Sequence, residues 1–558
     1  MSLQFITGNS GNGKTKYLFN RIVKEAKENP RDNYLVIVPE QFTMQTQRQL
    51  VDLSENKVIM NIDVLSFKRL AYRVFDELGI TNLTVLEETG KNLVLRKLAA
   101  QEADKLGVIG RNLNRIGYIS EVKSLLSELV QYNISPEELG RYIASGRLSD
   151  TLSDKLKDVL VLYEAFEKFM QDKYITAEEI LNVLSNVAEE SDILRNSVIA
   201  FDEFTGFTPI QNQLIKKLFV ISKKIYVTLT IDCREDIFKS RGMQELFDMP
   251  KRTVKSLTEM AAFYGIEVEE PIILDKNYRL AENEELSFME QQLFRKRRCS
   301  FKKAPKHIHI DCLRDPKQEL TKIARRINEL VRNENLRYRD IAIVTGDVNI
   351  YAGYVREIFD KYNIPYFIDA TQEILFHPFI EFIRSIPDIA AQNFSADAVF
   401  RFLRCGFSEL LDSEIDVLEN YVLACGVRGK SAWDKKWVRL PKHKAGYNLE
   451  LLNQSREYIM ELLKPVYQVF SDKKSTVKDY VLAIYKLIVL LDIPDKLAKK
   501  EQALLDAGDQ TASKEYGQIY KIVMQLFEKY VAVLGDECMD TEEFTQILDA
   551  GLDAADVA

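Results

Sequence analysis

The chain contains few of the residues that build metal and disulfide sites. Only four of its 558 residues are histidines, and its six cysteines include no C-x-x-C pair. Structural zinc sites need cysteine and histidine at close, regular spacing, so the sequence predicts none. Scattered cysteines of this kind are typical of free thiols in the reducing cytoplasm.

The chain also lacks a net positive charge and long hydrophobic runs. The net charge of −8 argues against a uniformly basic nucleic-acid binder but leaves room for local basic grooves. No apolar run is long enough to span a bilayer, and residues 1–4 lead directly into an expected strand. We therefore expect a cytoplasmic protein without a signal peptide. The length predicts three or four domains of ordinary globular composition.

What is present at the start of the chain is a complete phosphate-binding loop, G-x-x-x-x-G-K-[ST]. Its residues are Gly8, Asn9, Ser10, Gly11, Asn12, Gly13, Lys14 and Thr15. An apolar strand pattern precedes this loop and a helical spacing follows it, which is the context that phosphate binding requires. Lys14 is expected to reach the β- and γ-phosphates of a nucleotide, and Thr15 to hold Mg²⁺. The alternative is a glycine-rich turn that binds nothing.

Strand and helix patterns alternate in two parts of the chain. Residues 1–88 read as α/β units, and strand patterns return at 197–201 and 224–230. Amphipathic helical patterns fill the stretch between them, which predicts an α/β domain interrupted by a helical insertion. Strand patterns at 307–310 and 340–345, around a helix at 317–333, predict the start of a second α/β domain. Helical patterns prevail again from about residue 379.

A basic stretch covers residues 295–306 and contains Pro305. A solvated linker and a contact with a phosphate backbone are both compatible with this composition. His307 and His309 alternate with isoleucine, which favours structural roles over metal binding.

An acidic pair follows the apolar strand at 198–201. A phosphate loop needs a carboxylate for Mg²⁺ and a base that orients the attacking water. Asp202 is expected to hold the metal and Glu203 to polarise the water. Arg279 lies in a segment between the two α/β regions, where it either reaches a γ-phosphate or forms a surface salt bridge.

Polar, basic and aromatic residues interleave near the second and third strands. Gln41 and Thr43, with Phe67, Arg69 and Tyr72, form a mixture that suits stacking and hydrogen bonding to unstacked bases. The aromatic members of this group are equally compatible with a hydrophobic core.

Together these motifs resemble superfamily 1 DNA helicases of the UvrD and RecB kind, and more closely the AddB subunits of bacterial AddAB helicase–nucleases. The segments that carry the resemblance are GNSGNGKT (8–15), VPEQFT (38–43), SFKRLAYRVF (66–75), FDEFTGFTPIQ (201–211), VTLTIDCRED (227–236), DKNYRL (275–280) and residues 340–369.

The resemblance implies an α/β fold of P-loop NTPase type, with RecA-like motor domains and large helical insertions. The first motor domain would comprise residues 1–88 and 195–280, and the insertion residues 89–194. The second motor domain would begin at 281–378, and residues 379–558 would belong to a truncated helical insertion. The implied cofactors are ATP and Mg²⁺, with Lys14, Asp202 and Glu203 as catalytic residues.

The resemblance also implies a heterodimer with an AddA-like helicase–nuclease that processes double-strand breaks for recombination. In that complex this subunit scans single-stranded DNA for a recombination hotspot, next to duplex DNA and away from membranes. The implied DNA contacts are Gln41, Thr43, Phe67, Arg69 and Tyr72, with Phe207 as a further candidate. Tyr72 stands where the family often has tryptophan.

Three departures from the family pattern matter for activity. Thr205 and Gly206 replace the glutamine and aspartate that relay nucleotide state in active motors, and residues 231–234 keep little of the third helicase motif. Full members continue into a nuclease domain with an iron–sulfur cluster, so we expect an N-terminal fragment without that cluster. Weak ATP hydrolysis without translocation is the expected outcome. The alternatives are an active superfamily 1 helicase and a structural subunit with a stabilising ATP site.

Overall fold

The computed structural model describes all residues except 82–84, 87, 109–117, 147, 172–173, 296–298, 369–371, 374–375, 442–446, 554–555 and 558. The chain forms two compact units. Unit 1 contains Met1–Leu86, Ser124–Leu148 and Glu167–Asp311, and unit 2 contains Glu87–Lys123, Ser149–Phe166 and Cys312–Ala558. Among the described helices, none has both the length and the apolarity needed to cross a membrane.

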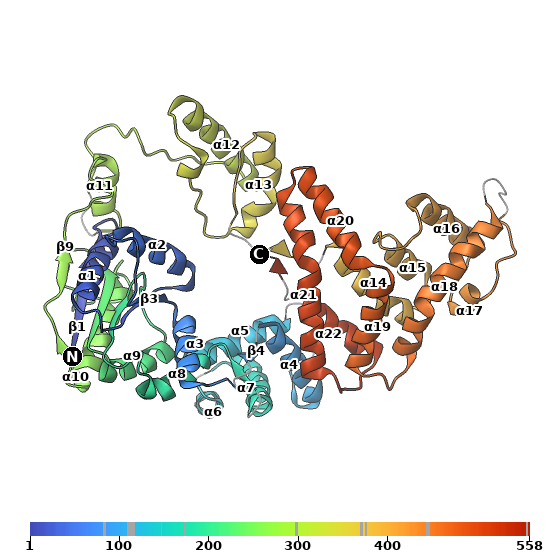
Figure 1. Ribbon diagram of the computed structural model, residues 1–558, viewed down its shortest axis with the longest axis horizontal. Coiled ribbons are helices and arrows are strands. Elements are labelled where there is room, and N and C mark those ends of the chain that lie inside the picture. The colour runs from blue at the N-terminus through green and yellow to red at the C-terminus, as the bar shows by residue number, and fades with distance from the viewer. Residues whose placement is uncertain are drawn as a thin grey trace. The chain divides into compact units, whose positions relative to one another are not determined.

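Unit 1 is built around a parallel sheet with the strand order β3-β2-β6-β7-β1-β8, and β9 also pairs with β1 (Figure 1). The strands are β1 (Ser2–Gly8), β2 (Tyr34–Ile37), β3 (Ile62–Leu65), β6 (Val198–Phe201), β7 (Lys224–Thr230), β8 (Glu267–Val268) and β9 (Ile272–Leu274). Near-continuous apolar runs such as β2 are fully buried, as expected for strands covered on both faces. The predicted α/β class is confirmed, whereas the RecA-like assignment stays a prediction.

Alternate side chains of the strands belong to two separate hydrophobic cores, because successive residues of a strand point to opposite faces. On one face Leu35 and Ile199 pack with α3 (Phe67–Leu78), α8 (Ile180–Val187), α9 (Pro209–Ile221) and α10 (Asp248–Phe263). On the other face Val36 and Ala200 pack with α1 (Lys14–Glu28) and α2 (Thr43–Leu53). Because the strands are parallel, their carboxyl ends meet at one edge of the sheet, where ligands bind in folds of this class.

Local signals set the ends of the helices at this edge. Helix α3 begins after Ser66, whose hydroxyl accepts a hydrogen bond from the Arg69 amide, and ends at Gly79 with φ of 67°. Helix α9 begins with a capping box formed by Thr208 and Gln211. These caps account for both ends of α3 and for the start of α9.

The remaining elements of unit 1 are shorter. They are β4 (Val85–Leu86), α6 (Pro136–Ala144), β5 (Ile175–Thr176) and α11 (Glu284–Gln292). Helices α5 (Tyr118–Gln131) and α7 (Asp150–Met170) are each divided between the two units. Residues 124–148 and 167–194, predicted as part of one helical insertion, thus group with the sheet; the division into motor domains and insertions stays a prediction.

Unit 2 is mainly helical. Its helices are α4 (Glu88–Gln101), α12 (Pro316–Asn333), α13 (Asn349–Lys361), α14 (Pro378–Ala391), α15 (Ala396–Leu403), α16 (Asp412–Cys425), α17 (Lys430–Asp434), α18 (Leu449–Ser471), α19 (Val477–Leu490), α20 (Ile493–Asp506), α21 (Gln510–Leu534) and α22 (Thr541–Asp553). Two short strands, β10 (Gln372–Glu373) and β11 (Asp556–Val557), pair antiparallel. The largest core of the chain lies here and includes both tryptophans, Trp433 and Trp437.

The strands predicted at 307–310 and 340–345 do not form. The structure assigns no strand to either segment, although α12 lies between them as predicted. Ile310 is 93% exposed and Val344 is 92% exposed. A strand needs a hydrogen-bonded neighbour, and the apolar alternation alone does not supply one.

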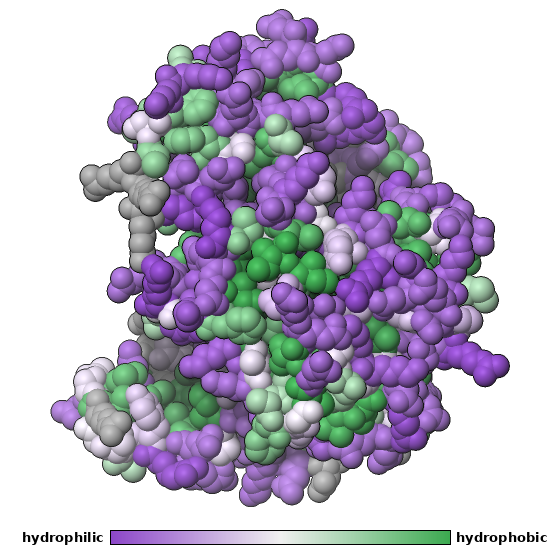
Figure 2. All heavy atoms as spheres, turned by 90° about the vertical axis from the view of Figure 1, so that its left-hand side faces the viewer, coloured by the Kyte–Doolittle hydropathy of each residue, from purple (hydrophilic) through white to green (hydrophobic). Residues whose placement is uncertain are grey.

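The outer edge of the sheet in unit 1 is partly apolar. Figure 2 looks onto the side where β9 and α11 lie in Figure 1, and hydrophobic side chains gather near the middle of this largely hydrophilic face. Ile273 on β9 is 48% exposed at this edge. Strand β9 has three residues and follows Pro271, two features that protect edge strands from pairing with other chains.

Candidate nucleotide site

The phosphate loop connects the end of β1 to the first residue of α1, as predicted. Gly11 has φ of 88°, a left-handed conformation that favours glycine. A Cβ atom at Gly11 would lie 2.8 Å from Oδ1 of Asn277, and one at Gly8 would lie 2.5 Å from the carbonyl oxygen of Leu274. The glycines therefore allow a close approach of the chain that follows β9 to the loop.

Lys14 points back into the loop that it closes. Its Nζ donates to the carbonyl oxygen of Asn9 at 3.0 Å. Burial lowers the pKa of Lys14, and the nearby Arg279 acts in the same direction, while Asp202 and Glu203 oppose them. A positive charge desolvated in this way is best compensated by an anion in the loop.

Asp202 and Glu203 lie at the end of β6, directly above the loop. The Thr228 hydroxyl donates to Oδ1 of Asp202, whereas Oδ2 is buried without a hydrogen-bond partner among the described residues. Burial raises the pKa of Asp202, and the neighbouring Glu203 carboxylate adds to this rise. A buried carboxylate oxygen without a donor is the arrangement expected at a cation site.

Glu203 adopts a left-handed backbone conformation with φ of 64°, which is unusual for a residue with a side chain. Oε1 of Glu203 accepts a hydrogen bond from Oγ1 of Thr15 at 3.4 Å. Strained backbone of this kind is found mainly where a side chain must be aimed at a site. The turn thus places Glu203 beside the two residues expected to hold Mg²⁺.

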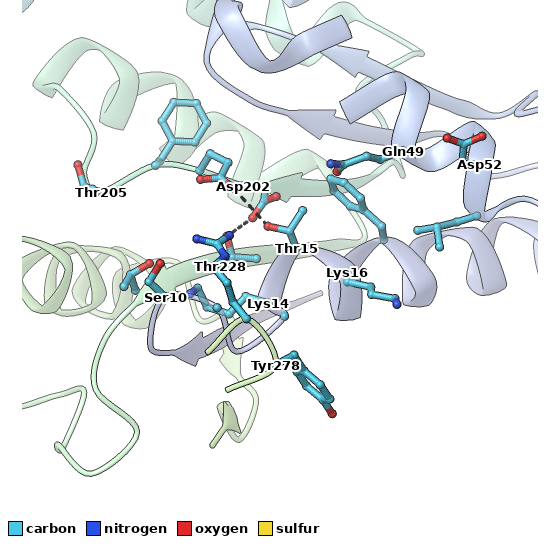
Figure 3. Close-up of a pocket in the computed structure, with 18 residues that line it drawn as sticks. Ser10, Lys14, Thr15, Lys16, Gln49, Asp52, Asp202, Thr205, Thr228 and Tyr278 are labelled. Atoms are coloured by element: carbon cyan, nitrogen blue, oxygen red, sulfur yellow. Dashed lines mark hydrogen bonds between the residues drawn. The ribbon is translucent and has the colours of Figure 1, made fainter. Parts of the chain in front are cut away.

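These residues line one cavity of about 730 Å³. Figure 3 shows Lys14, Thr15, Asp202 and Thr228 grouped at its centre, with Gln49 and Asp52 from α2 on one side and Ser10 and Thr205 on the other. The described residues contain no group of three or more His, Cys, Asp or Glu that would hold a metal alone. Magnesium in nucleotide sites needs fewer, since it takes ligands from phosphates and water, so Thr15 and Asp202 suit it.

The predicted Arg279 lines this cavity, and so does Tyr278, which the sequence reasoning missed. The Tyr278 ring is 65% exposed and lies next to Gly13, where a Cβ atom would be 3.5 Å from the ring. An exposed aromatic ring at the rim of a phosphate site is suited to stacking on a base. Only its neighbour Arg279, in the same motif, could have indicated it.

Thr205 and Gly206, the two positions that depart from the helicase pattern, lie in a turn against α10. The carbonyl oxygen of Thr205 accepts a hydrogen bond from the Thr253 hydroxyl at 3.0 Å, which ties the turn to α10. A Cβ atom at Gly206 would lie 3.3 Å from the same hydroxyl. The turn that contains both positions is therefore packed against α10.

The residues predicted to contact DNA lie near the carboxyl ends of β2, β3 and β6, but not all are accessible. Gln41 is exposed, Tyr72 is 39% exposed, and Nε of Arg69 donates to Oε1 of Glu40 at 2.9 Å. Thr43 is buried, and its hydroxyl donates to the carbonyl oxygen of Glu40.

Phe67 is also buried, at 8% exposure. Its ring packs against Phe201 at 5.8 Å and Phe204 at 5.6 Å, and half-buried Phe207 lies 5.2 Å from Phe201. The rings form an aromatic cluster beneath the surface that bears Arg69 and Tyr72. DNA binding by all six residues stays a prediction, and contact at Thr43 or Phe67 would require their neighbours to move.

Comparisons with known proteins identify the family of the chain. The chain is 38% identical over its whole length to the B-type subunit of an ATP-dependent helicase/deoxyribonuclease from Lachnoclostridium phytofermentans. Proteins with the same description from Clostridium acetobutylicum and Caldanaerobacter subterraneus subsp. tengcongensis are each 32% identical, over 99% and 100% of the chain. The chain spans 49%, 48% and 49% of these three relatives, or about half their length. Residues 5–290 match the family model described as ADDB, N-terminal, and the chain belongs to this family.

Proposed function

We propose that this chain serves as the AddB-like subunit of a helicase–nuclease complex that repairs double-strand breaks by homologous recombination in the cytoplasm. Within it the chain binds ATP with Mg²⁺ and single-stranded DNA, and scans that strand for a hotspot sequence. Its partner is an AddA-like helicase–nuclease. One observation carries the proposal of nucleotide binding. Oδ2 of Asp202 is buried without a hydrogen-bond partner among the described residues, and it lies above a phosphate loop whose Lys14 is desolvated.

The site residues divide the work of holding a nucleotide. The loop amides and Lys14 bind phosphate oxygens, and the Tyr278 ring stacks on the base. The Thr15 hydroxyl and Asp202 hold Mg²⁺, which supplies charge neutralisation for the phosphates when bound. Glu203 accepts a proton from water near Thr15, and its exposure keeps it accessible to solvent.

The turn after Glu203 supports the proposal that the chain binds ATP but does not use it efficiently for translocation. Neither Thr205 nor Gly206 carries the amide or carboxylate that relays nucleotide state in active motors, and the Thr253 hydroxyl ties the turn to α10. We therefore propose a decayed motor that hydrolyses ATP slowly. An active superfamily 1 helicase would show DNA-stimulated turnover and unwinding, and a purely structural ATP site would show slow turnover that DNA leaves unchanged.

Nucleotide binding is tested by titrating ATP–Mg²⁺ into the 558-residue chain and its Lys14→Ala variant. Loss of a charge-assisted phosphate contact should weaken binding by about 30-fold or more. Lys24→Ala is the matched control, since Lys24 is an exposed lysine of the same helix. Equal affinity of the Lys14→Ala variant and the unmodified chain would refute the proposed site.

DNA binding is tested at the exposed residues, because truncating buried Phe67 would damage the core. Arg69→Ala and Tyr72→Ala should each weaken binding of single-stranded DNA by about fivefold to tenfold, the range for one ionic or stacking contact. Arg31→Ala removes the same charge from the loop before β2, at the opposite edge of the sheet, and serves as control. If both variants bind hotspot and scrambled strands as the unmodified chain does, the scanning assignment fails.

A further inference from the structure

Asn9 connects the phosphate loop to two distant parts of unit 1. It is 5% exposed, and both Nδ2 and Oδ1 of its side chain form hydrogen bonds. Nδ2 donates to Oε1 of Glu290 on α11 at 2.7 Å, and Oδ1 accepts from the amide of Cys233 after β7 at 3.0 Å. The carbonyl oxygen of the same residue accepts from Lys14. One loop residue thus contacts the phosphate-binding lysine, the end of β7 and α11.

The end of α11 is held at a second point by a buried ion pair. Asp232, next to Cys233, has a side chain that is 1% exposed. Its Oδ2 lies 2.9 Å from Nε of Arg295 and 2.6 Å from Nη2 of Arg234. Although burial acts to raise it, the pKa of Asp232 is held well below its usual range by these hydrogen bonds. The Arg295 guanidinium also lies over the Phe247 ring, 4.9 Å from its centroid.

The residues between β9 and α11 also contact the phosphate loop. Nδ2 of Asn277 donates to the carbonyl oxygen of Ser10, and the Tyr278 amide donates to that of Gly11, both at 3.0 Å. The stretch from Asn277 to Glu290 therefore contacts the loop at both ends, and Arg295 ties the residues that follow to Asp232. Any shift of the loop on phosphate binding must be transmitted to this segment.

We propose that Asn9, Glu290, Asp232 and Arg295 form a latch that couples occupancy of the phosphate loop to the docking of α11. The latch rests on the proposed nucleotide binding. Glu290 lies close enough to Lys14 to favour its charged form. A triphosphate that takes over Lys14 brings negative charge toward the Glu290 carboxylate, and Asn9 loses the lysine that held its carbonyl oxygen. Bound nucleotide therefore loosens the contact between Glu290 and Asn9.

The latch also predicts how substitutions of Glu290 change the affinity for nucleotide. Coupling between two sites is reciprocal, so a nucleotide that loosens α11 binds more tightly when α11 is already loose. Glu290→Ala should raise the affinity for ATP–Mg²⁺ by about tenfold or more, the factor expected for one hydrogen bond to a charged group. Glu290→Gln keeps an acceptor for Asn9 and removes only the charge, so it should raise the affinity less.

The test is hydrogen exchange of the α11 amides in the 558-residue chain, with and without a saturating non-hydrolysable ATP analogue and Mg²⁺. Exchange should accelerate several-fold with the analogue, remain unchanged by it in Lys14→Ala, and be fast without it in Glu290→Ala. Glu282→Gln, which neutralises an exposed carboxylate before α11, should behave as the unmodified chain does. Melting curves of each variant exclude global unfolding as the cause of fast exchange.

The outcomes separate the two proposals. Measured analogue binding with unchanged or slower α11 exchange would overturn the latch and leave the nucleotide site standing. Equal or weaker nucleotide affinity in both Glu290 variants would also overturn it. Failure of the unmodified chain to bind the analogue would overturn the nucleotide site and the latch together.

Discussion

The Thr228 hydroxyl donates a hydrogen bond to one carboxylate oxygen of Asp202, and the other oxygen has no partner among the described residues. Two neighbouring strands, β6 and β7, supply this pair. A half-satisfied buried carboxylate costs free energy of folding, and that cost is expected where a cation is to be bound. The site thus gives up stability for function at an identifiable atom.

Replacing this carboxylate should stabilise the free chain. Because the folded-state pKa of Asp202 is raised, its contribution to stability is lost as pH rises through that pKa, so the unmodified chain is penalised at neutral pH. Asp202→Asn should raise the free energy of unfolding of unit 1 by about 1–2 kcal/mol at pH 8 without Mg²⁺. The gain, followed by far-UV circular dichroism in urea, should shrink toward pH 4. A variant that is less stable at pH 8 would contradict this interpretation.

Gly11 is expected to be less replaceable than other glycines with positive φ. Gly79→Ala introduces backbone strain of about 1 kcal/mol because Gly79 has φ of 67°. It adds no clash, since nothing lies within 4 Å of the added Cβ atom. Gly11→Ala adds the same strain and also forces Asn277 and Arg279 away from the loop. Its affinity for ATP–Mg²⁺ should fall at least tenfold while that of Gly79→Ala is unchanged. Equal nucleotide affinities in the two variants would argue against a role for this close approach.

The strained turn at Glu203 predicts how two replacements of this residue differ in stability. Glycine adopts φ of 64° without the steric cost that a Cβ atom imposes. Glu203→Gly should therefore be more stable than Glu203→Ala by about 1 kcal/mol, and both should lose ATP turnover. Comparison of their urea midpoints tests the strain, and the result would contradict it if alanine were the more stable replacement.

Unit 2 should lose stability in acid through His377. Burial lowers the pKa of His377 to about 4, whereas unfolded histidine titrates near 6.5. The unfolded chain binds the extra proton between these values, so stability is full above about pH 6.5 and falls toward pH 4, by roughly 2–3 kcal/mol. Both tryptophans lie in unit 2, so their fluorescence in urea follows this unit alone.

His377→Asn is the informative variant for this pH dependence. Nδ1 of His377 accepts from the Phe379 amide at the start of α14, and asparagine can retain such a cap without titrating. The variant should flatten the pH dependence, and His309→Asn, which changes an exposed histidine, should not. An unchanged slope in His377→Asn would assign the acid sensitivity to other groups.

Local features of the sequence were predictable, and contacts between distant segments were not. The bounds of β7 and α3 follow from an apolar run and from caps at Ser66 and Gly79, which are written in adjacent residues. The apolar run at 341–344 predicts an extended backbone, but pairing depends on a neighbour that the pattern does not encode. Apolar spacing likewise does not decide whether Phe67 faces a core or a ligand.

The candidate site shows the same division. Its phosphate loop and acidic pair are contiguous motifs, so the sequence alone placed them at strand ends. The contact between Ser10 and Asn277 joins residues 267 positions apart, and no local signal in either segment announces it. The contacts of Tyr278 with Gly11 and of Asn9 with Glu290 likewise join segments that are far apart in the sequence.

The most direct test of the decayed motor is strand separation and ATP turnover by the 558-residue chain on partly duplex DNA. We predict that ATP–Mg²⁺ binds through Lys14, that turnover stays slow with DNA present, and that no strands separate. Processive, DNA-stimulated unwinding that disappears in Lys14→Ala would contradict the decayed motor and identify an active one.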